Sequence, residues 1–228
     1  MKELFLELGI DLSNDQLEKF NKYFDFLVEW NEKINLTSIV EEKEVHIKHF
    51  FDSLSVVKVY DFKDQSICDI GSGAGFPGIP LKIIFPELKL TIIDSLKKRI
   101  DFLELLAKEL NLEMTCVHAR AEEYIKYKRE KFDVVFARAV AKLNILSELC
   151  IPYVKVGGFF ISFKGGDVVN EVKQSMQAFE KLGASLDNVV TYQLPDKMGE
   201  RSLVKVIKIK ASNQTYPRIF GKIKKLPL

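Results

Sequence analysis

The 228-residue sequence has few of the features that mark secreted, membrane-spanning or metal-binding proteins. Its three cysteines, Cys68, Cys116 and Cys150, are far apart and form no CxxC or Cys/His spacing, which argues against a disulfide framework and a zinc site. No apolar run approaches the roughly 18–20 residues of a membrane-spanning helix. The N-terminal stretch MKELFLELGIDLSND is interrupted by acidic residues, unlike a signal peptide. We therefore expect a cytoplasmic protein without a metal site.

Acidic residues are absent from the last part of the chain, and this changes the meaning of the small net charge of +2. Eight basic residues and no acidic one follow residue 200, whereas residues 1–200 hold 26 basic and 32 acidic residues. Such segregation is typical of proteins that bind a polyanion, although a basic end is as often simply solvated. Hydrophobic residues make up 47% of the chain and charged residues 29%, which is a composition that folds around a core.

Two different periodicities divide the chain. Ser13 and Gln16 form a capping box, and apolar residues recur at helical spacing from there to Ile34 and again over about residues 41–60. From residue 66 onward, short apolar strands alternate with amphipathic helices such as 96–110. The expected strands are Ser66–Ile70, Leu88–Ile93, Leu112–Val117, Phe132–Phe136, Gly158–Phe163, Leu186–Tyr192 and Ser202–Lys210.

This alternation predicts an α/β fold with a mostly parallel seven-stranded sheet that is covered on both faces. No helix separates the last two strands, so we expect the sheet to close with an antiparallel strand. The predicted organisation is an N-terminal helical extension (1–62), a Rossmann-like core (63–211) and a basic C-terminal tail (212–228). Sheets of this kind bind their ligands beyond the carboxyl ends of the strands.

A glycine-rich loop directly after the first strand is the most informative segment. It reads D-x-G-x-G-x-G, from Asp69 through Gly71 and Gly73 to Gly75. A dinucleotide-binding loop needs G-x-G-x-x-G, but Phe76 occupies the third glycine position. The loop instead resembles the S-adenosylmethionine loop of class I methyltransferases, and Asp69 is expected to face the ammonium or sulfonium charge, directly or through water.

Two charged residues stand at the carboxyl ends of later strands. Asp94 ends the second strand, where an acid commonly accepts hydrogen bonds from ribose hydroxyls, although it could instead cap the helix that follows. Arg138 ends the fourth strand, where an arginine is unusual unless it forms a salt bridge or binds a ligand. The functional interpretation places Arg138 near the cofactor and the target base or its phosphate.

The sequence also lacks two signatures of nucleic-acid methylation. The fourth strand ends without the D/N-P-P-Y/F element of amino-group methyltransferases. Cys68 and Cys116 lie inside expected strands, which favours buried apolar thiols over the covalent thiolate of cytosine C5 methylation. A nucleophile that has its own lone pair, such as a purine ring nitrogen, fits these absences.

The chain resembles the bacterial ribosomal RNA small-subunit methyltransferase G family, also called glucose-inhibited division protein B. The motifs that carry this resemblance are Trp30-Asn…Asn35-Leu-Thr-Ser38, His49-Phe-Phe-Asp52-Ser53, Asp69-Ile-Gly-Ser-Gly-Ala-Gly-Phe-Pro-Gly-Ile-Pro-Leu81, Asp94-Ser-Leu-Lys-Lys-Arg99, Arg138-Ala, Lys164-Gly165, Glu200-Arg201 and the ending Tyr216-Pro-Arg218…Lys-Lys225-Leu-Pro-Leu. The resemblance implies methyl transfer from S-adenosylmethionine to N7 of guanosine 527 in the 530 loop of 16S rRNA. Phe76 and Ala74 depart mildly from the family, where many relatives have Leu and some have Pro.

Residue roles follow from this resemblance position by position. It implies cofactor contacts at Gly71, Phe76, Asp94, Ala121, Glu122 and Arg138, to which the loop adds Asp69, Gly73 and Gly75. Ala121 and Glu122 would hold the adenine, and Arg138 is also the candidate catalytic residue. The expected RNA-binding residues are Lys97, Lys98, Arg99, Lys164, Arg201, Arg218, Lys222, Lys224 and Lys225. His49 and Asp52 are one helical turn apart and are either structural or part of the cleft.

Two other functions remain open at this stage. A small-molecule methyltransferase would need an enclosed aromatic acceptor pocket and no basic tail, whereas a non-catalytic ribosome-assembly factor would not need an intact cofactor loop. The expected partner is 16S rRNA or the small ribosomal subunit, and we expect a monomer. Truncation after Ala211 is expected to weaken subunit binding through lost phosphate contacts and to leave cofactor affinity unchanged.

Overall fold

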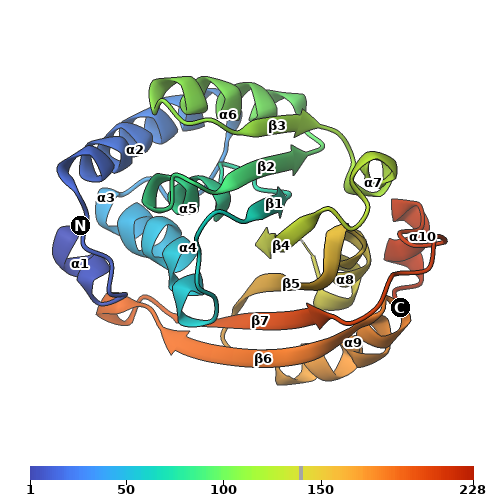
Figure 1. The fold of residues 1–228 in the computed structure, drawn as a ribbon. Coiled ribbons are helices and arrows are strands. Elements are labelled where there is room, and N and C mark those ends of the chain that lie inside the picture. The colour runs from blue at the N-terminus through green and yellow to red at the C-terminus, as the bar shows by residue number, and fades with distance from the viewer. Residues whose placement is uncertain (139–140) are drawn as a thin grey trace.

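A seven-stranded sheet forms the centre of the computed structural model, which describes residues 1–138 and 141–228 (Figure 1). The strands are β1 (Ser66–Ile70), β2 (Lys89–Asp94), β3 (Thr115–His118), β4 (Phe132–Arg138), β5 (Val154–Gly165), β6 (Ala184–Gln193) and β7 (Glu200–Lys208). Their order is β3-β2-β1-β4-β5-β7-β6. The first five strands pair in parallel, and β7 is antiparallel to both β5 and β6. The predicted fold class, with its antiparallel last strand, is confirmed.

Helices α1 to α4 precede the first strand, α5 to α9 connect successive strands, and α10 follows the last strand. The α-helices are α1 (Lys2–Leu6), α2 (Asn14–Ile34), α3 (Glu42–Val45), α4 (Asp52–Leu54), α5 (Gly78–Ile84), α6 (Lys97–Glu109), α7 (Ala121–Lys128), α8 (Leu143–Cys150), α9 (Val169–Lys181) and α10 (Phe220–Lys225). A π-helix, η1 (His46–Phe51), joins α3 to α4, and 3-10 turns form η2 (Ser55–Lys58), η3 (Ile151–Tyr153) and η4 (Pro195–Lys197). No helix in the described ranges is both long and apolar enough to cross a membrane.

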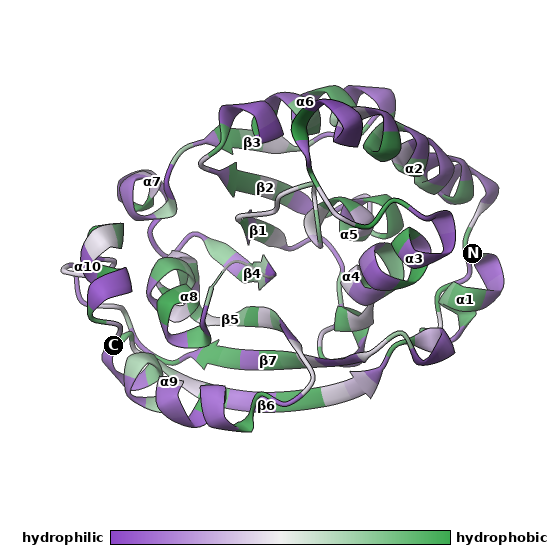
Figure 2. Ribbon diagram, turned by 180° about the vertical axis from the view of Figure 1, so that it is seen from behind, coloured by the Kyte–Doolittle hydropathy of each residue, from purple (hydrophilic) through white to green (hydrophobic). Residues whose placement is uncertain are grey.

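The sheet separates two hydrophobic cores because side chains alternate between its faces. Along β4, Val134 and Phe136 belong to a core under α2, α5 and α6, whereas Val135 and Ala137 belong to a core under α7, α8 and α9. Figure 2 shows that the strands are mostly hydrophobic and that the surrounding helices carry both hydrophobic and hydrophilic residues. Cys68 is fully buried in the second core, as expected, but Cys116 is only partly buried because β3 lies at the edge of the sheet.

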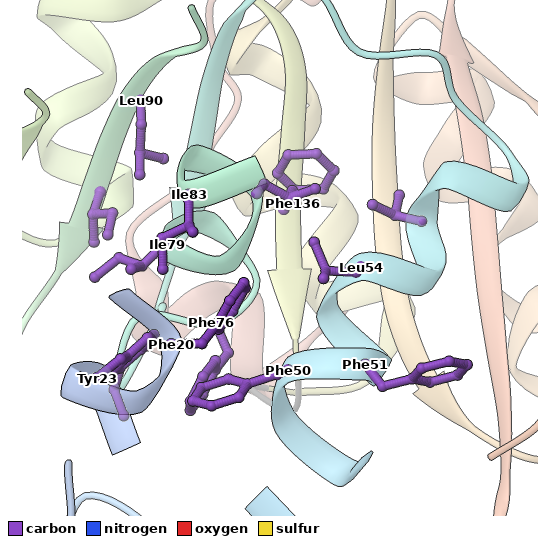
Figure 3. Packing of buried hydrophobic residues seen from close by; sticks show 14 of the residues in the cluster. Phe20, Tyr23, Phe50, Phe51, Leu54, Phe76, Ile79, Ile83, Leu90 and Phe136 are labelled. Atoms are coloured by element: carbon purple, nitrogen blue, oxygen red, sulfur yellow. The ribbon is translucent and has the colours of Figure 1, made fainter. Parts of the chain in front are cut away.

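Aromatic side chains attach the N-terminal helices to the first face of the sheet. Phe20 and Tyr23 of α2 pack against Phe50 of η1, and Tyr23 stacks on Phe76 of the glycine loop at 5.4 Å between ring centroids (Figure 3). The predicted capping box at Ser13 is present, and its Gln16 amide also donates to the carbonyls at the end of α5. The helices before β1 are therefore fixed against the loop that follows β1.

The C-terminal segment (212–228), for which we expected a basic tail, contains a helix that packs against the core. It forms α10, where Ile223 is fully buried, and α10 lies beside α7 and α8 in both views (Figures 1 and 2). Lys208, the last residue of β7, is 1% exposed and donates to the Ile151 carbonyl at 3.1 Å. Burial lowers the pKa of Lys208 to about 8 despite the nearby Glu130. The limits at residues 62 and 211 stay predictions.

Candidate active site

A cavity of about 520 Å³ opens at the carboxyl ends of β1, β2, β3 and β4. Such a position is where parallel sheets bind ligands, because the strand ends and the following loops leave a crevice there. Eight of the residues predicted from sequence line this cavity, namely Gly71, Gly73, Phe76, Asp94, Arg99, Ala121, Glu122 and Arg138. They come from four separate chain segments, so the fold brings them together.

The glycine loop forms one wall of the cavity. Gly71, Gly73 and Gly75 have φ angles of 71°, 63° and 105°, in the region where side chains other than glycine are strained. A Cβ on Gly73 would meet no atom within 4 Å, so the backbone there is open to a ligand. A Cβ on Gly75 would lie 2.7 Å from the Tyr23 hydroxyl, so this glycine allows the loop to pack against α2. Gly75 is therefore a packing residue.

Asp69 lies beneath the loop and does not line the cavity, so its expected contact with the ligand, directly or through water, stays a prediction. Its side chain is fully buried, and its Oδ2 accepts a hydrogen bond from the Gly78 amide at 2.9 Å. Burial raises the pKa of Asp69 to about 7, and the Gly78 hydrogen bond opposes this shift. The Asp69 carboxyl thus holds the start of α5 against the end of β1.

Asp94 connects the loop to the segment after β2. Its Oδ1 accepts from the Leu96 amide at 2.9 Å, and its Oδ2 accepts from the Gly73 amide at 3.3 Å. The N-cap of α6 is Leu96, which forms no side-chain cap, so Asp94 does not cap this helix as the alternative interpretation required. Arg99 lies 3.5 Å from Oδ2. The carboxylate is 3% exposed and lines the cavity, which leaves the ribose role as a prediction.

Substituting Asp94 with asparagine is expected to weaken cofactor binding by about tenfold, since a carboxylate accepts hydrogen bonds more strongly than an amide. The side-chain oxygen of the asparagine can still accept the hydrogen bond from the Leu96 backbone amide, so we expect the variant to fold. Titration calorimetry with S-adenosylhomocysteine measures the change. Asp101→Asn is the matched control, since the Asp101 side chain lies on α6 and is 44% exposed. An unchanged affinity in Asp94→Asn would rule out the ribose role.

Arg138 forms the ion pair that the structural interpretation expected and also lines the cavity, while its place near the cofactor and the target base stays a prediction. Its guanidinium lies 3.1 Å from Asp52 Oδ2 and 2.6 Å from His49 Nδ1. It also sits over the Phe76 ring, with 5.2 Å from Cζ to the ring centroid. His49 and Asp52, whose role was open, therefore hold Arg138 from the N-terminal helices. This arrangement fixes the orientation of the arginine at the cavity wall.

His49 is neutral in this arrangement. Because Arg138 has only donors, His49 Nδ1 must accept from it, which leaves the proton on Nε2. Nε2 lies 2.9 Å from the Thr37 hydroxyl and donates to it. Burial, together with the Arg138 charge, lowers the pKa of His49 to about 3. His49 therefore acts as a neutral acceptor that orients Arg138.

Three hydrogen-bonding residues of this site were missed by sequence reasoning. Tyr192 of β6 donates to Asp52 Oδ1 at 2.7 Å, and Tyr23 of α2 donates to the Ala74 carbonyl at 2.6 Å. Thr37 is the third, through His49. Each acts on a group at least 12 positions away along the chain. Thr37 lies within the quoted motif Asn35-Leu-Thr-Ser38, which gives it no stated role, and no pattern near Tyr23 or Tyr192 signals a site.

The basic residues expected to bind RNA have different environments. Lys164 is 11% exposed and pairs with Glu171 at 2.8 Å, and Arg218 forms a two-pronged ion pair with the fully buried Glu148. These internal pairs already engage the charges of Lys164 and Arg218, and their RNA-binding role stays a prediction. Arg201 lies 3.8 Å from Asp52 and is 27% exposed.

The remaining cations lie on the surface of two helices. Lys97 and Lys98 are exposed at the start of α6, where Lys97 pairs with Asp101, and Arg99 is turned toward the cavity. Lys222, Lys224 and Lys225 are exposed on α10.

Within residues 1–138 and 141–228, no cluster of three His, Cys, Asp or Glu side chains is placed to hold a metal ion. Burial raises the pKa of Cys116 to about 12, so this thiol stays protonated.

Comparisons with known proteins agree with this geometry. The family model described as rRNA small subunit methyltransferase G matches residues 16–204. A relative from Bacillus cytotoxicus, named ribosomal RNA small subunit methyltransferase G, is 52% identical over 226 residues, which are 97% of this chain and 95% of the relative. A relative of the same name from Bacillus cereus (strain B4264) is also 52% identical over 226 residues, with the same coverage of both chains.

Solved structures at low identity share the fold. A SAM-dependent methyltransferase from Aquifex aeolicus aligns with a TM-score of 0.55 at 16% identity, over 74% of this chain and 94% of that one. The M. jannaschii protein TYW2, solved in complex with AdoMet, aligns with a TM-score of 0.53 at 16% identity, over 64% of this chain and 70% of its own. At this identity the likeness shows the fold alone, which is that of class I methyltransferases.

Proposed function

Because the chain belongs to the ribosomal RNA small subunit methyltransferase G family, we propose that it methylates N7 of guanosine 527 in the 530 loop of 16S rRNA with S-adenosylmethionine. One observation carries the proposal: Gly71 and Gly73 of the glycine loop, Asp94 and Arg138 all meet at one cavity. A non-catalytic assembly factor would have no need for this convergence. We further propose that the protein acts as a monomer in the cytoplasm.

The cavity residues fit S-adenosylmethionine. The buried Ser72 hydroxyl lines the cavity and has no hydrogen-bond partner among the described residues, so a polar ligand group would satisfy it. The open backbone at Gly73 allows close approach, and Asp94 presents a carboxylate to ribose hydroxyls. Ala121 and Glu122 would hold the adenine. When bound, the cofactor supplies an electrophilic methyl group on a sulfonium.

Methyl transfer to guanine N7 needs alignment more than acid–base help. The N7 lone pair forms the new N–C bond while the methyl carbon leaves sulfur along the same line, so no proton has to be removed. Neutral His49 and protonated thiols are consistent with such chemistry. Arg138 cannot form the usual two-pronged contact with O6 and N7, since this would block the nucleophile. We propose that it holds O6 or a phosphate.

A deletion strain tests this function directly. We expect 16S rRNA from the strain to lack N7 methylation at guanosine 527, as measured by primer extension after N7-specific cleavage. A plasmid-borne copy of the gene should restore the modification, and a copy with Arg138→Ala should not. If guanosine 527 stays methylated without this protein, the assignment is wrong.

A further inference from the structure

Phe220 brings the C-terminal segment into the cavity. It is the first residue of α10, and it lines the cavity together with Leu149 of α8 and with Ala121 and Glu122 at the start of α7. It is partly buried against the second hydrophobic core, in which Leu149 and Ala121 lie. The family model ends at residue 204, so this contact lies beyond the matched span.

A buried ion pair fixes the position of Phe220. Arg218 donates from Nε to Glu148 Oε1 at 2.8 Å and from Nη2 to Oε2 at 2.6 Å, and its backbone amide also donates to Oε1 at 2.9 Å. Glu148 is fully buried and directly precedes Leu149. On the other side of Phe220, Ile223 is fully buried. The segment is therefore anchored both before and after the aromatic ring.

The neighbours of Phe220 indicate which part of the ligand it meets. Phe76, His49 and Arg138 group around the first face of the sheet, where the methyl group would be transferred. Ala121 and Leu149 belong to the opposite face. Since Ala121 and Glu122 are the proposed adenine contacts, Phe220 lies at the adenine end of the cavity. An aromatic ring at such a place offers a π-face to a purine.

We propose that Phe220 is a cofactor-binding residue that packs against the adenine of S-adenosylmethionine, and that α10 thereby forms a wall of the cofactor site. This inference rests on the proposed cofactor. It reverses the expectation from sequence that truncation after Ala211 leaves cofactor affinity intact, because truncation removes Phe220 and also leaves Glu148 buried without Arg218.

Titration calorimetry of the full chain with S-adenosylhomocysteine tests the inference. We expect Phe220→Ala to raise Kd by about tenfold, Phe220→Leu to raise it by a smaller factor, and Phe220→Tyr to stay within twofold of the parent. Ile219→Ala is the matched control, since Ile219 is 76% exposed and does not line the cavity. Phe220→Leu keeps apolar volume and so tests the ring even if the alanine variant loosens the segment.

The outcomes separate this inference from the proposed function. A Kd within twofold of the parent for both Phe220→Ala and Phe220→Leu overturns the inference, as does an equal loss in Ile219→Ala. Methylation of small subunits should show a raised KM for S-adenosylmethionine with kcat kept in Phe220→Ala. A parent chain that binds the cofactor but leaves guanosine 527 unmodified contradicts the proposed function and not the role of Phe220.

Discussion

Replacing Arg138 with alanine is expected to lower the single-turnover rate of methyl transfer by about 100-fold or more, with a far smaller change in cofactor affinity. The reason is positional. His49 and Asp52 hold the guanidinium at the cavity wall, 5.2 Å over the Phe76 ring, so the substitution removes a cation with a fixed orientation at the proposed transfer point. Rapid-quench measurement on small ribosomal subunits gives the rate, and calorimetry gives the affinity.

The Arg138 prediction needs a control for folding, because the variant leaves buried Asp52 with Tyr192 as its nearest partner. Lys181→Ala, on the exposed end of α9, removes a cation remote from the cavity and should keep the full rate. Arg138→Lys should retain part of the rate, because lysine keeps the positive charge but lacks the planar guanidinium whose two nitrogens reach Asp52 and His49. Normal cofactor and RNA binding with an unchanged rate in Arg138→Ala would exclude a catalytic role.

Replacing Arg218 with alanine is expected to lower the free energy of unfolding by about 3 kcal/mol. The substitution leaves the Glu148 carboxylate buried without its cation, and an uncompensated buried charge is costly in a low-dielectric interior. Urea denaturation followed by circular dichroism measures the loss. The same variant should bind S-adenosylhomocysteine more weakly, because Arg218 anchors the segment that carries Phe220.

Two further variants separate a buried ion pair from an exposed one. Arg218→Met combined with Glu148→Gln removes both charges and should recover at least half of the lost stability, because no buried charge is left. Lys155→Met breaks a pair with Asp133 whose side chains are 43% and 34% exposed, and it should cost less than about 1 kcal/mol. Equal effects of Arg218→Ala and Lys155→Met would contradict the buried-pair interpretation.

Much of the cofactor site was predictable because its residues follow strands. A parallel sheet brings the carboxyl ends of its strands to one edge, so Gly71, Asp94 and Arg138 could be placed together from periodicity alone. Asp69 does not line the cavity because it lies inside β1, where side chains alternate between the two faces of the sheet. It shares a side with Ile67, toward the core under α5, while Ile70 reaches the cavity.

The charged residues outside the strand ends were predicted less well. Sequence shows that Lys164, Lys208 and Arg218 are basic, but it does not show which acids the fold places beside them. Glu148 lies 70 positions before Arg218 in the chain, and no local pattern links the two. Arg218 was therefore grouped with the exposed lysines of the same basic end as an RNA-binding residue, although it is held by an internal ion pair.

The sequence by itself determined the α/β fold, the antiparallel closing strand and the family, because hydrophobic periodicity and loop motifs are local properties of the chain. Only the tertiary structure decided what each polar group contacts. Tyr192 reaches Asp52 across 140 positions, and α10 folds back so that Phe220 lines the cavity. These contacts depend on which helices cover the two faces of the sheet. Helices and strands that are distant in sequence pack together without changing the spacing of residues within each element, so sequence patterns do not reveal these contacts.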